Sequence, residues 1–299
     1  MERVETKRSI KLLPKARTLS GDEFREQLLK PWPHIGVGTI VAAILIVTIY
    51  SWGINGTNAR PDELVEGIPN IINFIVRLFP PQLKTMPYSL QVPNVNIALP
   101  VPEVIFAIIE TVQMAIIGTT LAIFLSIPFG LLAARNTAPH PTVYQITRLI
   151  MNVNRAIPDI IFALVFVAAV GLGPFGGVLA LAVGSIGFMG KLYAESIEAI
   201  DPQQVLAVRA TGANRLQTFL YGVVPQALPL IASYSLLLFE SNVRSATILG
   251  LVGAGGVGFT IHKYLSLFQY RYLTGALILI TITVTVVDRV SDRLRKKIT

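Results

Sequence analysis

The sequence predicts an all-α fold, a polytopic membrane helix bundle with about six transmembrane helices. Of its 299 residues, 53% are hydrophobic and 14% are charged, whereas soluble domains carry about 25% charged residues. Charged residues are absent from five long stretches, and a membrane-spanning helix needs about 20 mainly apolar residues. These stretches are 31–59, 111–134, 160–190, 216–239 and 272–287, and the third can hold parts of two spans.

The expected spans follow from these stretches. Arg155, Pro158 and Asp159 lie near the start of the third span, so its inner end is expected to be irregular. The tail 1–33 holds eight Lys or Arg before any apolar run, unlike a secretory signal, in which the apolar run follows directly. It is therefore expected to be a cytoplasmic tail. The six spans are placed at 34–54, 108–132, 150–171, 175–196, 226–249 and 272–289.

Basic residues predict the orientation, because cytoplasmic loops carry an excess of Lys and Arg. With the N-terminus placed inside, the N-terminal tail contains 8 Lys or Arg, and segments 134–156 and 191–225 contain 3 each. The C-terminal end, with its basic tail 290–299, contains 5. The remaining 6 of the 25 fall outside. Both termini are therefore expected in the cytoplasm of a multi-pass inner-membrane protein. The net charge of +8 is attributed to this bias rather than to a nucleic-acid partner.

The long outer loop 55–107 contains an amphipathic pattern. Pro61 and Asp62 can open a helix, and Pro80 and Pro81 can close it. We expect this helix to lie on the outer membrane surface and to contact lipid. A helix that caps the bundle by packing remains an alternative. The apolar residues at helical spacing are Leu64, Ile68, Ile71, Ile75 and Leu78.

The polar segment between the fourth and fifth spans predicts two short helices. Asp201 can cap the first helix, and Gly212 can end it in the left-handed conformation. Asn214 can cap the second helix, with Gln217 three residues on. Pro225 is expected to close the unit. Both helices are half apolar, which is typical of helices that dock into a groove of another protein.

The stretch LAVRATGANRLQTFLYGVVPQALP (206–229) resembles the coupling loop in membrane subunits of bacterial ABC importers. That family has a Glu-Ala-Ala-three residues-Gly motif followed by a later proline. Ala207, Gly212 and Pro225 match this motif, whereas Leu206 stands in place of the usual glutamate and Val208 in place of the second alanine. The resemblance covers most of the chain from about Glu110 to the end and implies a permease transmembrane domain at 108–289. It also implies that the coupling loop 201–225 contacts an ATPase. The implied contact residues are Leu206, Ala207, Arg209, Thr211, Gly212, Ala213 and Gln217.

Two further stretches resemble permeases for phosphonate, phosphite and related phosphorus oxyanions. They are ESNVRSATILGLVGAGGVGF (240–259) and RAIPDIIFAL (155–164). The resemblance implies a homodimeric permease that works with two copies of an ABC ATPase and one external substrate-binding protein. It implies no catalysis and no cofactor in this chain. Methionine-type permeases share part of the glycine-rich stretch, so a permease for another small solute remains an alternative.

Ionisable residues inside the membrane predict a substrate path or gate, because they are costly there and usually face a water-filled route. Two alternatives remain open. Glu240 and Arg244, four residues apart, can neutralise each other within one helix. Charges near the start of the third span, Arg148 among them, can reach the lipid surface. The path candidates are Glu240, Asn242, Arg244, Ser245, Arg155 and Asp159.

Other motifs are interpreted as structural. GAGGVG (253–258) lacks the strand and acidic residue of a dinucleotide site, so its glycines are expected to allow close packing. GSIGFMGKLY (184–193) departs from the phosphate-loop spacing, so ATP must bind to a separate subunit. Glu195 and Glu198 are interpreted as a solvated helix end. The chain has no cysteine and three scattered histidines, which predicts no metal site.

Two other function classes are weaker alternatives. One is an ion-driven secondary transporter, for which the sequence shows no convincing repeat. The other is a lipid-modifying enzyme, for which it shows no catalytic cluster.

Overall fold

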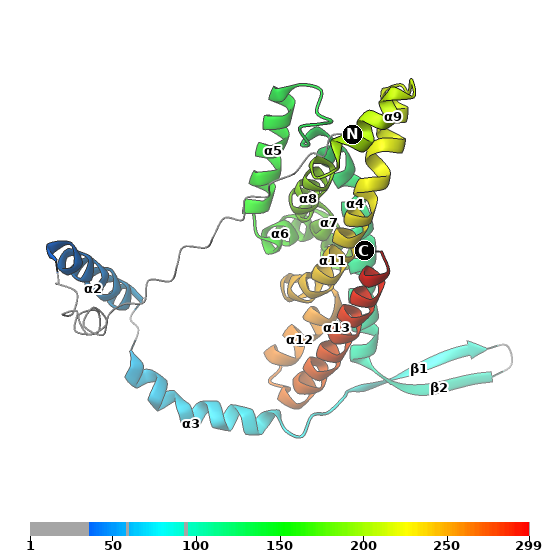
Figure 1. Ribbon diagram of the computed structural model, residues 1–299. Helices are drawn as coiled ribbons and strands as arrows, with labels where there is room; N and C mark the ends of the chain where they lie inside the picture. The colour runs from blue at the N-terminus through cyan, green and yellow to red at the C-terminus, as the bar shows by residue number, and fades with distance from the viewer. Residues whose placement is uncertain (1–35, 58–59, 93–94, 299) are drawn as a thin grey trace, which may run out of the picture. The chain divides into compact units, whose positions relative to one another are not determined.

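The computed structural model describes residues 36–57, 60–92 and 95–298. It divides into two compact units, 1–69 and 70–299, each of which is described by itself. The expected tail 1–33 lies outside the described residues. Helices dominate both units, which confirms the all-α class (Figure 1).

The first unit contains α2 (Val37–Thr57) and the beginning of α3. Helix α2 is apolar around its whole circumference, and none of its residues is buried within the chain. A helix that is apolar on all sides is typical of a membrane span. By length and composition α2 can cross a bilayer, which agrees with the predicted span 34–54.

Helix α3 (Pro61–Leu78) confirms the helix predicted in the loop after the first span. Its acidic first turn and basic last turn suit the helix dipole. Near its C-terminal end, the Phe74 ring lies edge-on to Tyr270 with centroids 5.2 Å apart, and Leu78 packs against a buried cluster. The last turns of α3 thus pack against the bundle, while several apolar side chains stay exposed. These are Ile68, Ile71, Ile72 and Ile75.

A two-stranded antiparallel hairpin follows, which the sequence analysis did not predict. Strand β1 (Thr85–Val92) pairs with β2 (Val95–Pro102) in a register that sets Thr85 opposite Pro102. The stretch contains several prolines, which argue against an internal strand because proline cannot donate to the ladder. A two-stranded ribbon consists of edges only, and proline is tolerated at edges. The pairing therefore escapes a pattern-based prediction.

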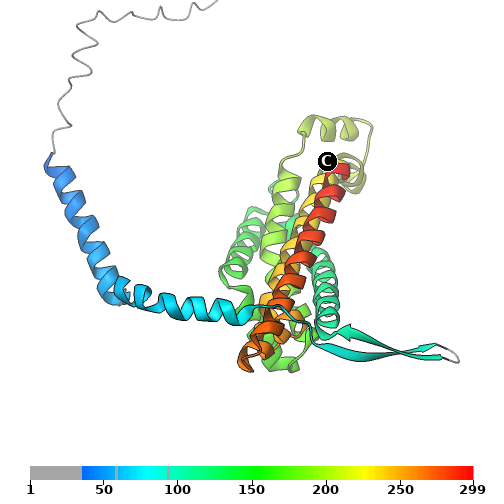
Figure 2. The same cartoon turned by 90° about the horizontal axis from the view of Figure 1, so that it is seen from below.

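The second unit contains a helix bundle between Glu103 and Ile298. Its elements are α4 (Glu103–Leu132), α5 (Pro141–Ala156), α6 (Asp159–Val170), α7 (Pro174–Gly184), α8 (Ile186–Glu198), α9 (Pro202–Ala210), α10 (Arg215–Thr218) with the π-helical η1 (Phe219–Val223), α11 (Val224–Leu249) with the 3₁₀ turn η2 (Gly250–Val252), α12 (Gly256–Ser266) and α13 (Tyr270–Ile298). Helix α4 packs against α7, α8, α11 and α12. Figure 2 shows the bundle from a perpendicular direction, with the C-terminal end of α13 pointing to the same end as α9.

In the described part of the chain, five helical segments are long and apolar enough to cross a membrane, and a bent pair makes up to six. The bent pair corrects the predicted third span. That span, 150–171, is not continuous, because α5 and α6 meet at an angle of 85°. Pro158 explains the break, since a proline disfavours helical geometry in the preceding residue. Accordingly, Ile157 is extended, with φ −89° and ψ 120°.

The glycine-rich stretch allows the close packing that the sequence predicts. Gly253, Gly255 and Gly256 have positive φ angles of 93°, 79° and 66°. The backbone at Gly250 and Gly258 comes so close that a Cβ on either residue would collide with main-chain atoms. The turn between α11 and α12 therefore depends on glycine.

Two buried clusters mark the two ends of the bundle. One contains Val104, Tyr264 and Leu273, and the other contains Ala134, Ile197 and Val223. At the first end, Glu103 accepts a bond from Lys263 Nζ at 2.7 Å and one from the Tyr264 hydroxyl at 3.3 Å. Burial, together with Glu103, raises the pKa of Tyr264 to about 12, so the phenol keeps its proton. The second end carries the polar segment between α8 and α11.

Candidate functional site

The two-helix element, residues 201–225, has the caps that the sequence predicts. Asp201 Oδ1 accepts a hydrogen bond from the Gln203 backbone N–H at 2.8 Å, and α9 begins between them. Gly212 ends the turn after α9 with a φ of 86°, a conformation that side chains with a Cβ rarely adopt. A Cβ there would meet no atom of the described residues within 4 Å. Backbone conformation, rather than space, therefore requires glycine at this position.

The second helix begins with a capping box. Asn214 Oδ1 accepts from the Gln217 N–H at 2.9 Å, and Gln217 Oε1 accepts from the Asn214 N–H at 2.9 Å. The prediction that Pro225 closes the two-helix unit is wrong, because the chain stays helical from α10 through η1 into α11. In η1 the Val224 N–H bonds to Phe219 O, five residues back. This wider turn comes directly before the proline, which lacks an N–H, and keeps the chain helical.

The two-helix element presents an apolar surface to solvent. Helix α9 has no buried residue, and Leu206 is 52% exposed. The continuous segment 215–252 has 38 residues and is therefore about 57 Å long, more than the hydrocarbon thickness of about 30 Å. A helix of this length is longer than a bilayer is thick, and its polar start carries Leu216 and Tyr221, which are 65% and 71% exposed. Such a surface is typical of a docking site.

The predicted ATPase-contact residues lie together on this surface. Six of them are exposed and Ala213 is half-buried. Val205 and Val208 face the other way, toward Gly222, and hold α9 against η1. An open pocket of about 420 Å³ lies between the helices, lined by Val208, Thr211, Gly212, Ala213, Gln217 and Tyr221. The six exposed residues are Leu206, Ala207, Arg209, Thr211, Gly212 and Gln217.

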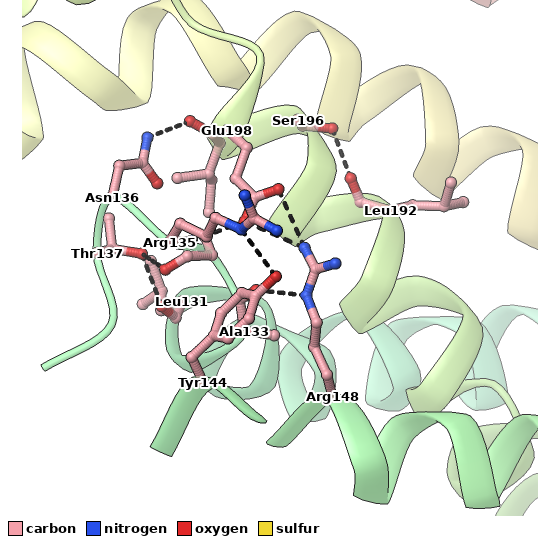
Figure 3. Close-up of polar contacts among 12 residues, drawn as sticks. Leu131, Ala133, Arg135, Asn136, Thr137, Tyr144, Arg148, Leu192, Ser196 and Glu198 are labelled. Carbon is pink, nitrogen blue, oxygen red and sulfur yellow. Dashed lines mark hydrogen bonds and ion pairs between the residues drawn. The ribbon is translucent and has the colours of Figure 1, made fainter. Parts of the chain in front are cut away.

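At the base of this element lies a group that we call the Glu198 cluster: Arg135, Tyr144, Arg148 and Glu198 (Figure 3). Arg148 Nη2 bonds to both carboxylate oxygens of Glu198, at 3.1 and 3.0 Å. The Arg135 backbone N–H donates to Glu198 at 2.7 Å. Arg148 Nε also donates to Ala133 O at 3.1 Å. The cluster therefore ties the end of α8 to the α4–α5 connection and to α5.

Tyr144 joins the two arginines of the Glu198 cluster. The centres of the Arg148 and Arg135 guanidinium groups lie 4.7 and 5.6 Å from its ring centroid, within the range of cation–π attraction. Its hydroxyl accepts a bond from Arg135 Nε at 3.0 Å, and this bond raises the pKa of Arg135 above its ordinary value. Arg135 therefore keeps its charge beside Glu198.

The Glu198 cluster corrects two interpretations of the sequence. Glu198 is not a solvated helix end, because its side chain is only 25% exposed and is paired with Arg148. Arg148 does not reach for lipid headgroups, because it bonds to Glu198 and to the Ala133 carbonyl. Glu198 and Ala133 lie 50 and 15 residues from Arg148 in the chain. No local spacing signal could have identified them.

The path candidates on α11 lie in two different environments: some contact α13, and others lie inside the bundle or near the interrupted helices. Arg244 bonds to Glu240 at 2.8 Å, as the intrahelical alternative predicts, but also to both oxygens of Asp288 on α13 at 3.1 Å. Glu240 in turn accepts a bond from Arg295 at 3.2 Å. The α11–α13 contact thus contains two acidic and two basic groups, and the Arg244 side chain remains 46% exposed.

Asn242 lies inside the bundle and is 3% exposed. Its Nδ2 donates to Thr119 Oγ1 at 2.9 Å, and its Oδ1 accepts from Ser185 Oγ at 3.3 Å. This side chain joins α11 to α4 and to the break between α7 and α8. In this conformation Asn242 therefore satisfies buried polar groups and does not face an open route.

The remaining candidates surround the break between α5 and α6. Ser245 Oγ donates to Asp159 Oδ2 at 3.1 Å, which connects α11 to the start of α6. Arg155 lies in the last turn of α5, directly before the break. Asn154 fixes this region, since it donates to Val183 O at 3.0 Å and accepts from the Gly187 N–H at 2.8 Å. Polar side chains therefore gather where two helices are interrupted within the bundle.

Comparison with known proteins places this arrangement in a family. Residues 126–299 match the family described as "Binding-protein-dependent transport system inner membrane component". The chain is 36% identical over 262 residues to the putative phosphite transport system permease protein HtxC of Stutzerimonas stutzeri, an alignment that covers 88% of this chain and 86% of that protein. It is 35% identical over 279 residues to the phosphite transport system permease protein PtxC of the same organism, covering 92% and 94%.

The fold agrees with this similarity. An inward-facing structure of the MetNI methionine ABC transporter superposes with a TM-score of 0.58 at 23% identity, and the match covers 66% of this chain and 96% of that one. This likeness concerns the fold alone. The sequence relatives are permeases rather than enzymes. The chain belongs to the family of binding-protein-dependent transport system inner membrane components, and it is the permease subunit of an ABC importer.

Proposed function

We propose that this permease imports a phosphorus oxyanion such as phosphite, a phosphonate or phosphate. The observation that carries the proposal is the 35–36% identity, over most of both chains, to permeases named for phosphite. The methionine transporter structure, at 23% identity, is a more distant match. Methionine therefore serves as the competing solute in the test.

In this proposal the two-helix element docks into a groove of an ABC ATPase on the cytoplasmic face. Its support is the exposed apolar surface around Leu206, Leu216 and Tyr221 and the fixed geometry of both helices, which are capped at Asp201 and Asn214. Alternating access requires that ATP binding favours one conformation over the other. A rigid docked element transmits the movement of the ATPases to the spans, whereas a flexible loop would change its own conformation instead.

The proposed assembly contains two copies of the permease, two ATPases and one external substrate-binding protein. Both permease termini lie in the cytoplasm. The charge bias supports this orientation, because 19 of the 25 Lys and Arg fall on the side of the two-helix element. The apolar face of α3 then lies on the outer membrane surface, where its isoleucines contact lipid.

We assign the substrate path to the α11–α13 contact and to the polar groups near the interrupted helices, with Arg244 as the group that attracts the anion. Arg244 is partly exposed although it lies in an apolar candidate span. Its guanidinium presents several N–H donors, which suit the oxygens of a phosphorus oxyanion. Asp288 and Glu240 hold it in place when no substrate is bound. Ser245, Asp159, Arg155 and Asn242 complete the assigned gate region.

Uptake competition tests the substrate. The permease is reconstituted with its ATPase and binding protein in proteoliposomes, and ATP-dependent uptake of labelled phosphite is measured against unlabelled phosphonate, phosphate and methionine. We expect competition from the phosphorus oxyanions and none from methionine. Uptake of labelled methionine with no uptake of phosphite would reject the proposed substrate class.

A further inference from the structure

A second feature with binding chemistry lies at the end of the bundle opposite the two-helix element. An open pocket of about 250 Å³, which we call the α12–α13 pocket, is formed where α13 begins and where the chain leaves α3. Its lining consists of two arginines, two glutamines and three aromatic residues. The arginines are Arg77, at the end of α3, and Arg271, in the first turn of α13.

The backbone around the α12–α13 pocket is fixed. The Gln82 N–H donates to Arg271 O at 3.0 Å. Gly275, one turn further along α13, lies so close to Gln82 that a Cβ would collide with its carbonyl oxygen. Phe74 packs edge-on against Tyr270. The segment after α3 is therefore attached to α13, and both arginines line the same pocket.

The charge of the α12–α13 pocket favours an anion. The described residues that line it include two guanidinium groups and no carboxylate. Among the described residues, neither arginine forms an ion pair, whereas Lys263 at the same end of the bundle pairs with Glu103 at 2.7 Å. Two like charges around one pocket repel each other, and a bound anion would relieve this repulsion. Guanidinium groups bind phosphate oxygens with paired N–H donors.

Two further observations point to a ligand. Within the described part of the chain, Gln269 Oε1 is buried and has no hydrogen-bond partner, although buried polar atoms in folded proteins are nearly always paired. This acceptor requires a donor, such as a P–OH group or an ammonium group. The neighbouring Phe268 has a φ of 55°, a conformation that is rare for a bulky residue and that concentrates at binding sites.

We propose that the α12–α13 pocket binds a phosphate-type anion that also carries a hydrogen-bond donor. Arg77 and Arg271 bind the oxyanion, and Gln269 accepts from the donor. Two sources supply this chemistry: a phospholipid headgroup such as phosphatidylethanolamine, and a free phosphorus oxyanion. The pocket lies at the end of a candidate span and includes Tyr270 and Tyr272, residues of a kind enriched where membranes meet water.

Two binding measurements on the purified full-length chain distinguish these sources. In the first, the delipidated chain in detergent is dialysed to equilibrium against labelled inorganic phosphate and, separately, phosphite. In the second, native mass spectrometry counts the phospholipids that remain bound after exposure to phosphatidylethanolamine, phosphatidylglycerol or phosphatidylcholine. The test variant is R77Q/R271Q. The control variant, R289Q/R293Q, removes the same charge from exposed positions at the far end of α13.

We expect one bound ligand per chain in at least one measurement. Affinity should fall about tenfold or more in R77Q/R271Q, because charge-assisted hydrogen bonds are lost, and should not change in R289Q/R293Q. Binding in the first measurement identifies a solute site, and binding in the second alone identifies a headgroup site. The single variants R77K and R271K keep the charge and lose the paired donors, so they should bind with intermediate affinity. Absence of ligand in both measurements, or equal binding by the wild type, R77Q/R271Q and the lysine variants, would overturn the proposal.

Discussion

Arg148 Nη2 and Glu198 Oε2 lie 3.0 Å apart and join α5 to the last turn of α8, three residues before the two-helix element begins. Gln226 adds a second tie at this base, since its Oε1 accepts from the Asp201 N–H at 3.0 Å. These contacts connect the base of the two-helix element to α5, whose end leads into the break before α6. The ion pair is a candidate positioning contact between the ATPase side and the gate region.

The first prediction concerns this ion pair. Glu198→Gln leaves Arg148 without its carboxylate and should lower the free energy of unfolding by about 1–3 kcal/mol. In the reconstituted importer, ATP hydrolysis should continue while uptake per ATP falls. Thermal unfolding and the ratio of uptake to hydrolysis are the measurements. Glu195→Gln is the matched control, because Glu195 is an exposed residue of the same helix.

A charge exchange separates positioning from simple stability. The variant E198R/R148E restores an ion pair with reversed polarity. Each single variant should lower the ratio of uptake to ATP hydrolysis, and we expect the double variant to recover part of this ratio. If E198Q couples as well as the wild type, or if the exchanged pair restores stability and no coupling, the positioning role is wrong.

The second prediction concerns Gly212. A valine there must adopt a φ near 86°, which costs about 1–2 kcal/mol, although no neighbouring atom obstructs it. Gly212→Val should leave the complex assembled and separate ATP hydrolysis from uptake. Gly212→Asn is the control, because asparagine tolerates the left-handed conformation. Coupled uptake at the wild-type level in Gly212→Val would count against a rigid turn.

The third prediction concerns Leu206, which replaces the glutamate of the resembled motif. Its exposed apolar side chain should contact the ATPase through burial rather than through charge. Leu206→Asp should weaken retention of the ATPase by about tenfold, because burying a Leu side chain contributes about 1.5–3 kcal/mol. The variant Leu206→Met should retain the ATPase as the wild type does. Co-purification over a range of salt concentrations measures this, and a wild-type contact that weakens steeply with salt would contradict an apolar role.

The fourth prediction concerns Arg244. Arg244→Gln removes the charge assigned to anion attraction, so Asp288 loses this ion pair and Glu240 keeps its bond from Arg295. Phosphite uptake should fall at least about tenfold, since a charge-assisted hydrogen bond contributes about 1.5–3 kcal/mol. Arg244→Lys should keep part of the uptake. Equal loss of phosphite uptake in Arg244→Gln and Arg244→Lys, or assembly failure in both variants, would indicate a structural role for the α11–α13 contact.

Local rules predicted much of this fold. The caps at Asp201 and Asn214 and the turn at Gly212 depend on neighbours within a few residues, so their sequence alone indicates them. The same holds for α3, whose apolar spacing and flanking prolines set its limits. Pro158 indicated an irregular third span, but the angle of 85° between α5 and α6 depends on how both helices pack.

Contacts between distant parts of the chain could not be predicted in this way. The Glu198 cluster joins residues from 135 to 198, and the Asn242 side chain bonds to Thr119, 123 residues away. The α12–α13 pocket brings Arg77 beside Arg271 only because the segment after α3 pairs with α13. A residue's spacing to its sequence neighbours carries no information about such partners.

The position of the two-helix element in the assembled importer tests the central claim most directly. The chain contains no cysteine, so single cysteines introduced at Thr211 and Gln217 can be crosslinked in membranes without competing crosslinks from other positions of this chain. We expect both to crosslink to the ATPase and to be protected from a membrane-impermeant thiol reagent added outside. Labelling of these positions from the outer side, or the absence of any ATPase crosslink in the assembled complex, would contradict the account.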